Sequence, residues 1–120
     1  MKIGIMTGGG DAPGLNGIIE SVSRVLLNNN TEIIGIKNGF EGIFKNDFIN
    51  LGFDNIKHAH SFAGTILGSS NKSSINNREV EFVNQYKNLG LNGLVVCGGD
   101  GTFLALNRVK DELNIIGVPK

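Results

Sequence analysis

The sequence predicts an α/β fold in which a mostly parallel sheet carries helices on both faces. Three observations lead to this prediction. Short apolar runs alternate along the chain with longer amphipathic segments, as strands and helices do in such folds. The apolar runs are continuous, as expected of strands that are covered on both faces. Glycine accounts for 18 of 120 residues and gathers where these runs end. The expected architecture is a Rossmann-like three-layer sandwich.

The first half of the chain contains three apolar runs and one amphipathic segment. Residues 3–6 and 32–36 read as buried strands, and 48–51 as a shorter one. Between the first two strands, apolar residues recur at helical spacing over residues 15–27, namely at Leu15, Ile18, Ile19, Val22 and Leu26. Residues 37–44 are expected to form a glycine-bearing turn with exposed aromatic side chains.

The second half begins with residues 56–74, whose apolar residues follow neither a helical nor a strand period. A helix is expected over residues 77–89, closed by Gly90. Its apolar face is predicted to consist of Val80, Val83 and Tyr86.

The last third of the chain repeats the strand-to-helix order of the first. A strand is expected at 94–97, a tight loop at 98–102, a helix over 102–113 and a final strand at 114–118.

Length and composition restrict the possible classes of protein. A chain of 120 residues and 12.8 kDa fits one small domain. Equal numbers of acidic and basic residues give no electrostatic case for nucleic acid or an anionic membrane as a partner. No apolar run approaches the length of a membrane span or a signal peptide, so a cytoplasmic location is expected. The single cysteine, Cys97, excludes an internal disulfide and is expected to be a buried strand residue.

The first glycine-rich loop runs from Thr7 to Asn16, between a strand and a helix. Glycines let backbone N–H groups approach an oxyanion, and the helix N-terminus adds about half a positive charge. Phosphate is therefore the favoured ligand. The loop has neither the Walker pattern nor the Gly-x-Gly-x-x-Gly pattern. A glycine-rich turn without a ligand is the alternative.

The second loop, Cys97 to Thr102, also follows an apolar strand. Asp100 is a candidate Mg²⁺ ligand, directly or through water. Gly101 and Thr102 would offer backbone N–H groups or a hydroxyl to phosphate oxygens. The alternative, compatible with the first interpretation, is that Asp100 caps the next helix.

A third segment, residues 63–72, combines glycines with small hydroxyl residues and ends at Lys72. Such residues suit a phosphate or a sugar, while a flexible surface loop is the alternative. His58 and His60 are expected to be solvent-exposed residues of a connection rather than metal ligands.

Four segments together resemble the 6-phosphofructokinase family in identity, order and spacing. They are 4–16 (GIMTGGGDAPGLN), 64–70 (GTILGSS), 98–102 (GGDGT) and 117–120 (GVPK). The resemblance covers essentially the whole chain. It implies that residues 1–120 correspond to the N-terminal portion of the family's nucleotide-binding domain.

The resemblance implies phosphoryl transfer from ATP to the 1-hydroxyl of fructose 6-phosphate in glycolysis, with Mg²⁺ as cofactor. It implies that Gly10 contacts the donor phosphates, that the segment from Gly99 to Thr102 wraps them and that Asp100 serves Mg²⁺. Phe40 falls where the family has an aromatic residue near the nucleotide. The full-length enzyme is expected to be a homodimer or homotetramer.

Two positions bear on the donor. Gly101 matches the glycine of ATP users, which leaves room for the α-phosphate, whereas pyrophosphate users carry an aspartate there. Lys120 resembles pyrophosphate users and an atypical branch of ATP users, and is expected to contact the donor or the transition state. ATP is favoured, with a pyrophosphate-dependent enzyme as the alternative.

The chain departs from the family pattern at several positions. Asn71 stands where the family commonly has an arginine, and Lys72 substitutes for it only as a point charge. Glu20 replaces one effector-site arginine while Arg24 retains its partner, so phosphate-effector regulation is not expected.

The chain ends directly after its last expected strand. By the resemblance, a Thr-Ile-Asp-Asn-Asp segment with the catalytic base would follow Lys120. Residues 1–120 are therefore expected to be a fragment without the base and the second domain, inactive on its own and of weak stability. A non-catalytic nucleotide-binding module is the alternative from another class. A lipid or NAD kinase shares only the Gly-Gly-Asp-Gly-Thr loop.

Overall fold

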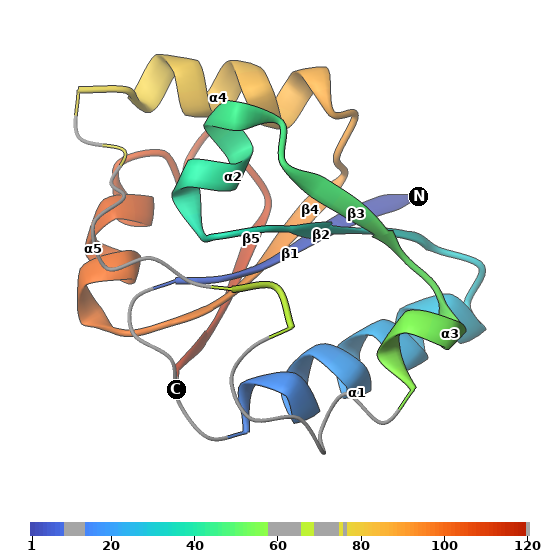
Figure 1. Cartoon of the computed structure of the whole chain (residues 1–120). Coiled ribbons are helices and arrows are strands. Elements are labelled where there is room, and N and C mark those ends of the chain that lie inside the picture. The colour runs from blue at the N-terminus through green and yellow to red at the C-terminus, as the bar shows by residue number, and fades with distance from the viewer. Residues whose placement is uncertain (9–13, 58–65, 69–74, 76, 120) are drawn as a thin grey trace.

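Five strands form a single sheet in the order β3-β2-β1-β4-β5 (Figure 1). The computed structural model describes residues 1–8, 14–57, 66–68, 75 and 77–119. The strands are β1 (Lys2–Thr7), β2 (Glu32–Ile36), β3 (Phe48–Leu51), β4 (Gly93–Gly98) and β5 (Ile115–Pro119). β1 pairs in parallel with β2 and β4, and β4 pairs in parallel with β5, whereas β3 is antiparallel to β2. The predicted mostly parallel sheet is thus confirmed.

Helices cover both faces of this sheet, as predicted (Figure 1). One face carries α1 and α3, and the other carries α2, α4 and α5. The helices are α1 (Leu15–Asn28), α2 (Phe40–Lys45), α3 (Phe53–Ile56), α4 (Glu79–Asn88) and α5 (Asp100–Asn107). The result is the expected three-layer sandwich.

Each face of the sheet has its own apolar core, because successive side chains of a strand point to opposite faces. Met6 and Val96 lie in the core under α2, α4 and α5, together with Phe82 of α4. Ile5 and Val95 lie in the other core, together with Ile19 of α1. The central strands are therefore apolar on both faces, which explains their continuous apolar runs.

The prediction of exposed aromatic side chains in residues 37–44 is wrong, although residues 37–39 do form a turn. This segment contains α2, and Phe40, expected to be an exposed aromatic residue, is only 4% exposed. Its ring packs edge-on against Phe82, with the ring centroids 5.8 Å apart. A six-residue helix is too short to show the 3.6-residue period in the sequence, so its buried face could not be recognised.

The buried face of α4 also differs from the prediction. Val80 is 75% exposed, and the buried residues are Phe82, Val83 and Tyr86. At 100° per residue, Val80 lies about 200° around the helix from Phe82, so the two cannot share one face. The helix ends as predicted, with Gly90 in the left-handed conformation (φ 72°) directly after its C-cap.

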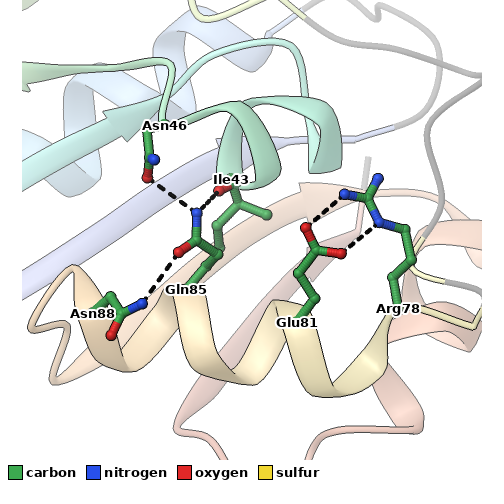
Figure 2. Close-up of polar contacts among 6 residues, drawn as sticks. All are labelled: Ile43, Asn46, Arg78, Glu81, Gln85 and Asn88. Carbon is green, nitrogen blue, oxygen red and sulfur yellow. Dashed lines mark hydrogen bonds and ion pairs between the residues drawn. The ribbon is translucent and has the colours of Figure 1, made fainter.

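The start of α4 is polar, and polar contacts also join this helix to the end of α2 (Figure 2). The Gln85 amide donates to the Ile43 carbonyl oxygen and to Asn46 Oδ1, each at 3.1 Å. Nearer the start of the helix, the Arg78 guanidinium binds both carboxylate oxygens of Glu81, at 2.9 and 2.8 Å. This pair lowers the pKa of the Glu81 carboxyl below its usual range, although both side chains are well exposed.

The last helix is shorter than predicted. α5 begins at Asp100 and ends at Asn107, whereas the apolar spacing predicts 102–113. Val109 and Leu113 are buried, so the spacing continues beyond the helix through a series of turns. Apolar spacing records which side chains are buried, and here it does not require a continuous helix.

Candidate functional site

The two central strands lead to helices on opposite faces of the sheet. β1 is followed by α1 on one face, and β4 by α5 on the other. At their carboxyl ends the strands remain paired, since the Gly8 N–H donates to the Cys97 carbonyl oxygen at 2.8 Å. Such a point, where neighbouring strands lead in opposite directions, is where open α/β sheets bind ligands. The first and second glycine-rich loops both start here.

The second loop is a helix N-terminus with an exposed carboxylate. Gly99 is the N-cap residue in an extended conformation, and α5 begins at Asp100. Asp100 is therefore not the cap, which corrects the alternative prediction for this residue. Within the described residues, no side chain caps α5. The first N–H groups of a helix have no partner in the helix, so they are free to meet an anion.

The Thr102 side chain packs against both strand ends rather than facing away from them. It is 7% exposed. A Cβ added at Gly8 would lie 2.8 Å from Thr102 Oγ1, and one at Gly98 would lie 2.9 Å from Thr102 Cβ. Thr102 thus fills the space that these two glycines leave. The Thr102 side chain is therefore not open to a ligand. Its backbone N–H, in the first turn of α5, points toward the helix N-terminus and is the group that could bind an anion.

Gly101 stands in a different environment. A Cβ added there would meet no described atom within 4 Å, and its φ lies outside the left-handed region. The described part of the fold would accept a side chain at this position. The glycine instead leaves the space beside the start of α5 open.

The first loop is described only at its ends. Gly14 has a φ of 88°, a conformation that favours glycine, and its carbonyl oxygen accepts the Ile18 N–H at 3.1 Å. Gly10, predicted to contact the donor phosphates, lies outside the described residues. So do the predicted site residues Asn71, Lys72 and Lys120, and both histidines.

A short anchored segment, Ile66 to Gly68, lies at the same edge of the sheet. Thr7 Oγ1 donates to the Gly68 carbonyl oxygen at 2.7 Å, and Asn16 Oδ1 accepts the Ile66 N–H at 2.6 Å. These roles of Thr7 and Asn16 were not predicted from the sequence. Two features of the sequence could have indicated these roles. Thr7 is a polar residue at the end of an apolar strand, and Asn16 is a polar residue at the start of an apolar helix face.

The donor set fits a magnesium ion that is held mainly through phosphate. Within the described residues, no group of three or more His, Cys, Asp and Glu side chains could hold a metal ion. Mg²⁺, however, is commonly bound by one or two carboxylates together with substrate phosphates and water. Asp100, exposed beside an open helix N-terminus, has the chemistry for this mode.

Two further predictions can be compared with the structure. Cys97 is fully buried in β4, as predicted, and burial raises the pKa of its thiol. Among the described helices, none has both the length and the apolar character that crossing a bilayer requires.

Comparisons with known proteins agree with the fold. A family model described as "Phosphofructokinase" matches residues 2–120. The chain is 41% identical over 135 residues to ATP-dependent 6-phosphofructokinase 2 of Clostridium perfringens. It is 38% identical over 121 residues to ATP-dependent 6-phosphofructokinase of Lactobacillus acidophilus.

These alignments cover 99% and 98% of this chain but 37% and 38% of the two relatives. The chain thus spans just over a third of the length of the curated relatives it matches. Among solved structures, phosphofructokinase from Pichia pastoris in the T-state has a TM-score of 0.85 at 25% identity. That match covers 98% of this chain and 14% of the other.

Proposed function

The chain belongs to the phosphofructokinase family, and we propose that it forms the donor-binding part of a 6-phosphofructokinase. The proposed reaction moves the terminal phosphoryl group of ATP to the 1-hydroxyl of fructose 6-phosphate. Both curated relatives described above carry the name ATP-dependent 6-phosphofructokinase. The same proposal assigns residues 1–120 to the N-terminal portion of the nucleotide-binding domain.

The proposed donor site lies where the carboxyl ends of β1 and β4 meet. Phosphoryl transfer depends mainly on positioning and on neutralising phosphate charge. The free N–H groups at the start of α5 are suited to bind phosphate oxygens. Gly10 and the residues Asn71 and Lys72 are proposed to contact the donor from the other two loops. Lys120 is proposed to contact the donor or the transition state.

Asp100 is the residue proposed to hold Mg²⁺, which neutralises phosphate charge when it is bound. In this arrangement Asp100 presents its carboxylate to the metal while the neighbouring N–H groups bind the phosphate directly. Without a cation, the Asp100 carboxylate would repel a phosphate bound at the helix N-terminus. Mg²⁺ between them would allow the carboxylate and the phosphate to lie side by side.

The open space at Gly101 is the observation that carries the choice of ATP. Neither backbone conformation nor packing in the described residues requires glycine there. The position therefore leaves room for a ligand, and the α-phosphate of a nucleotide would fill such a space. Pyrophosphate, which is smaller, would not need it.

The test compares Gly101→Asp with Gly52→Asp in the complete gene product. Gly52 is a matched control, because it also has no described atom within 4 Å of an added Cβ and also lies at the start of a helix, as the N-cap of α3. It follows β3, which runs antiparallel to β2, and so lies at the opposite edge of the sheet. We expect Gly101→Asp to raise the KM for ATP by tenfold or more, as an order of magnitude for one lost phosphate contact and added repulsion. Gly52→Asp should leave it unchanged.

Steady-state rates are measured with ATP and with pyrophosphate at saturating fructose 6-phosphate. A wild-type protein that uses neither donor would overturn the proposed function. Activity with pyrophosphate alone, unaffected by Gly101→Asp, would replace ATP by pyrophosphate as the donor. An equal loss of ATP use in both aspartate variants would remove the argument from Gly101.

A further inference from the structure

The Ile66–Gly68 segment is fixed to the sheet by a buried apolar side chain. Leu67 is fully buried in the core on the α1 face. Its Cδ2 lies 2.7 Å from the position that a Cβ on Gly35 of β2 would occupy. Leu67 thus packs directly onto the strand backbone at a residue without a side chain. A side chain at position 35 would require the Leu67 and Leu51 side chains to move.

Hydrogen bonds from β1, from α1 and from the turn after β2 then fix the direction of this segment. Thr7, the last residue of β1, donates its hydroxyl to the Gly68 carbonyl oxygen at 2.7 Å. Asn16, in the first turn of α1, accepts the Ile66 N–H at 2.6 Å. Asn38, which follows β2, donates its backbone N–H to the Leu67 carbonyl oxygen at 2.8 Å. All three residues of the segment are therefore bound through their backbones.

Two of these hydrogen bonds come from buried side chains that also border the first loop. Thr7 is fully buried and precedes Gly8, whereas Asn16 is 5% exposed and comes two residues after Gly14. The side chains on either side of this loop thus hold the same three-residue segment. The arrangement joins the two ends of the first loop to Ile66–Gly68 as one unit.

The position of Gly68 matters because two predicted site residues lie close to it in the sequence. Asn71 and Lys72 come three and four residues later, within about 14 Å for even a fully extended chain. The position at which Gly68 is held therefore limits how far these residues can reach. A shift of about 1 Å in a positioned group is enough to reduce catalysis substantially.

We infer that Thr7 and Asn16 are positioning residues of the donor site, which act by fixing Ile66–Gly68 against the first loop. This inference rests on the proposed phosphoryl transfer. Neither side chain is assigned a contact with the donor. Their effect is to hold Ile66–Gly68 against the two ends of the first loop.

The experiment replaces the Thr7 hydroxyl without changing the volume of the side chain. Thr7→Val removes the hydrogen bond to Gly68, and Thr7→Ser retains it. The control is Ile33→Val, a core change near the opposite edge of the sheet, in the same α1-side core. KM values for ATP and for fructose 6-phosphate are measured on the complete gene product, together with the melting temperature of each variant.

We expect Thr7→Val to raise the KM for ATP about tenfold while the KM for fructose 6-phosphate changes less than twofold. Thr7→Ser should restore the KM for ATP to within about twofold of wild type. Ile33→Val should lower the melting temperature without changing either KM.

A purely structural role would give a lower melting temperature in Thr7→Val with both KM values unchanged, and that outcome would overturn the inference. If Thr7→Val does not fold, Asn16→Leu removes the second hydrogen bond and is judged by the same two KM values. A wild-type protein without phosphotransferase activity would instead refute the proposed function on which the inference rests.

Discussion

The two central strands end in helix starts of opposite character. α1 begins at Leu15 and Asn16, both buried, after a glycine with a φ of 88°. α5 begins at Asp100 and Gly101, both exposed, after an N-cap in an extended conformation. The first residues of α1 are packed in the protein interior, whereas the first residues of α5 leave their backbone N–H groups accessible. Glycines near the two starts are thus present for different reasons.

The largest effect is expected where a glycine is required by packing. Gly8→Ala places a Cβ 2.8 Å from Thr102 Oγ1, and we expect it to destabilise the protein by about 1–3 kcal/mol. Thr102→Ala in the same chain should recover much of this loss, because the remaining contact, with Thr102 Cβ, is 3.4 Å. Urea unfolding of the two single variants and the double variant measures this coupling.

Gly98→Ala provides the matched control for this rescue. The added Cβ would lie 2.9 Å from Thr102 Cβ, an atom that Thr102→Ala retains. Its destabilisation should therefore persist in the double variant. Additive effects of Gly8→Ala and Thr102→Ala would show that Thr102 does not determine the need for Gly8.

A smaller effect of opposite sign is expected at Gly101. Gly101→Ala should stabilise the protein by about 0.5 kcal/mol, because alanine loses less conformational entropy than glycine in a helix. Urea unfolding of Gly101→Ala measures this change in the free energy of unfolding, and Gly98→Ala, which should be destabilised, serves as the comparison. A destabilisation comparable to that of Gly98→Ala would mean that the fold, and not a ligand, requires glycine at position 101.

Much of the fold could be predicted from the sequence because the long elements have clear apolar patterns. Strands such as Gly93–Gly98 are apolar on both faces, and α1 has enough turns to display its period. The short helices α2 and α3 lack that length. Strand order could not be read either, because it depends on which strands pair across the sheet.

The site was predictable only in part, for a related reason. The glycine-rich loops and Asp100 are continuous in sequence, so their chemistry is visible there. The contacts of Thr7 and Asn16 with Ile66–Gly68 join residues 50 or more positions apart, and only the folded chain brings them together. The burial of Thr102 between Gly8 and Gly98 likewise depends on the pairing of β1 with β4.

The smallest effect is expected at Glu79, a charged residue in the first turn of α4. The Glu79 carboxylate accepts its own backbone N–H and binds Arg108 at 3.2 Å, and both interactions lower the pKa of this carboxyl below the usual 4.5. A lowered pKa in the folded state stabilises the protein above about pH 4.5 and ceases to do so as the pH falls through the folded value. Glu79→Gln should therefore lower the melting temperature by about 2 °C or less at pH 7, given that exposed pairs contribute little.

The difference between wild type and Glu79→Gln should shrink as the pH falls below about 4.5, and also at pH 7 in 1 M salt, which screens the pair with Arg108. Thermal unfolding at pH 7, 5 and 3 measures it. A difference that is equally large at pH 3 would show that Glu79 stabilises α4 by packing rather than through its charge. In that case the Glu79 carboxylate would not stabilise the first N–H groups of α4 through its charge.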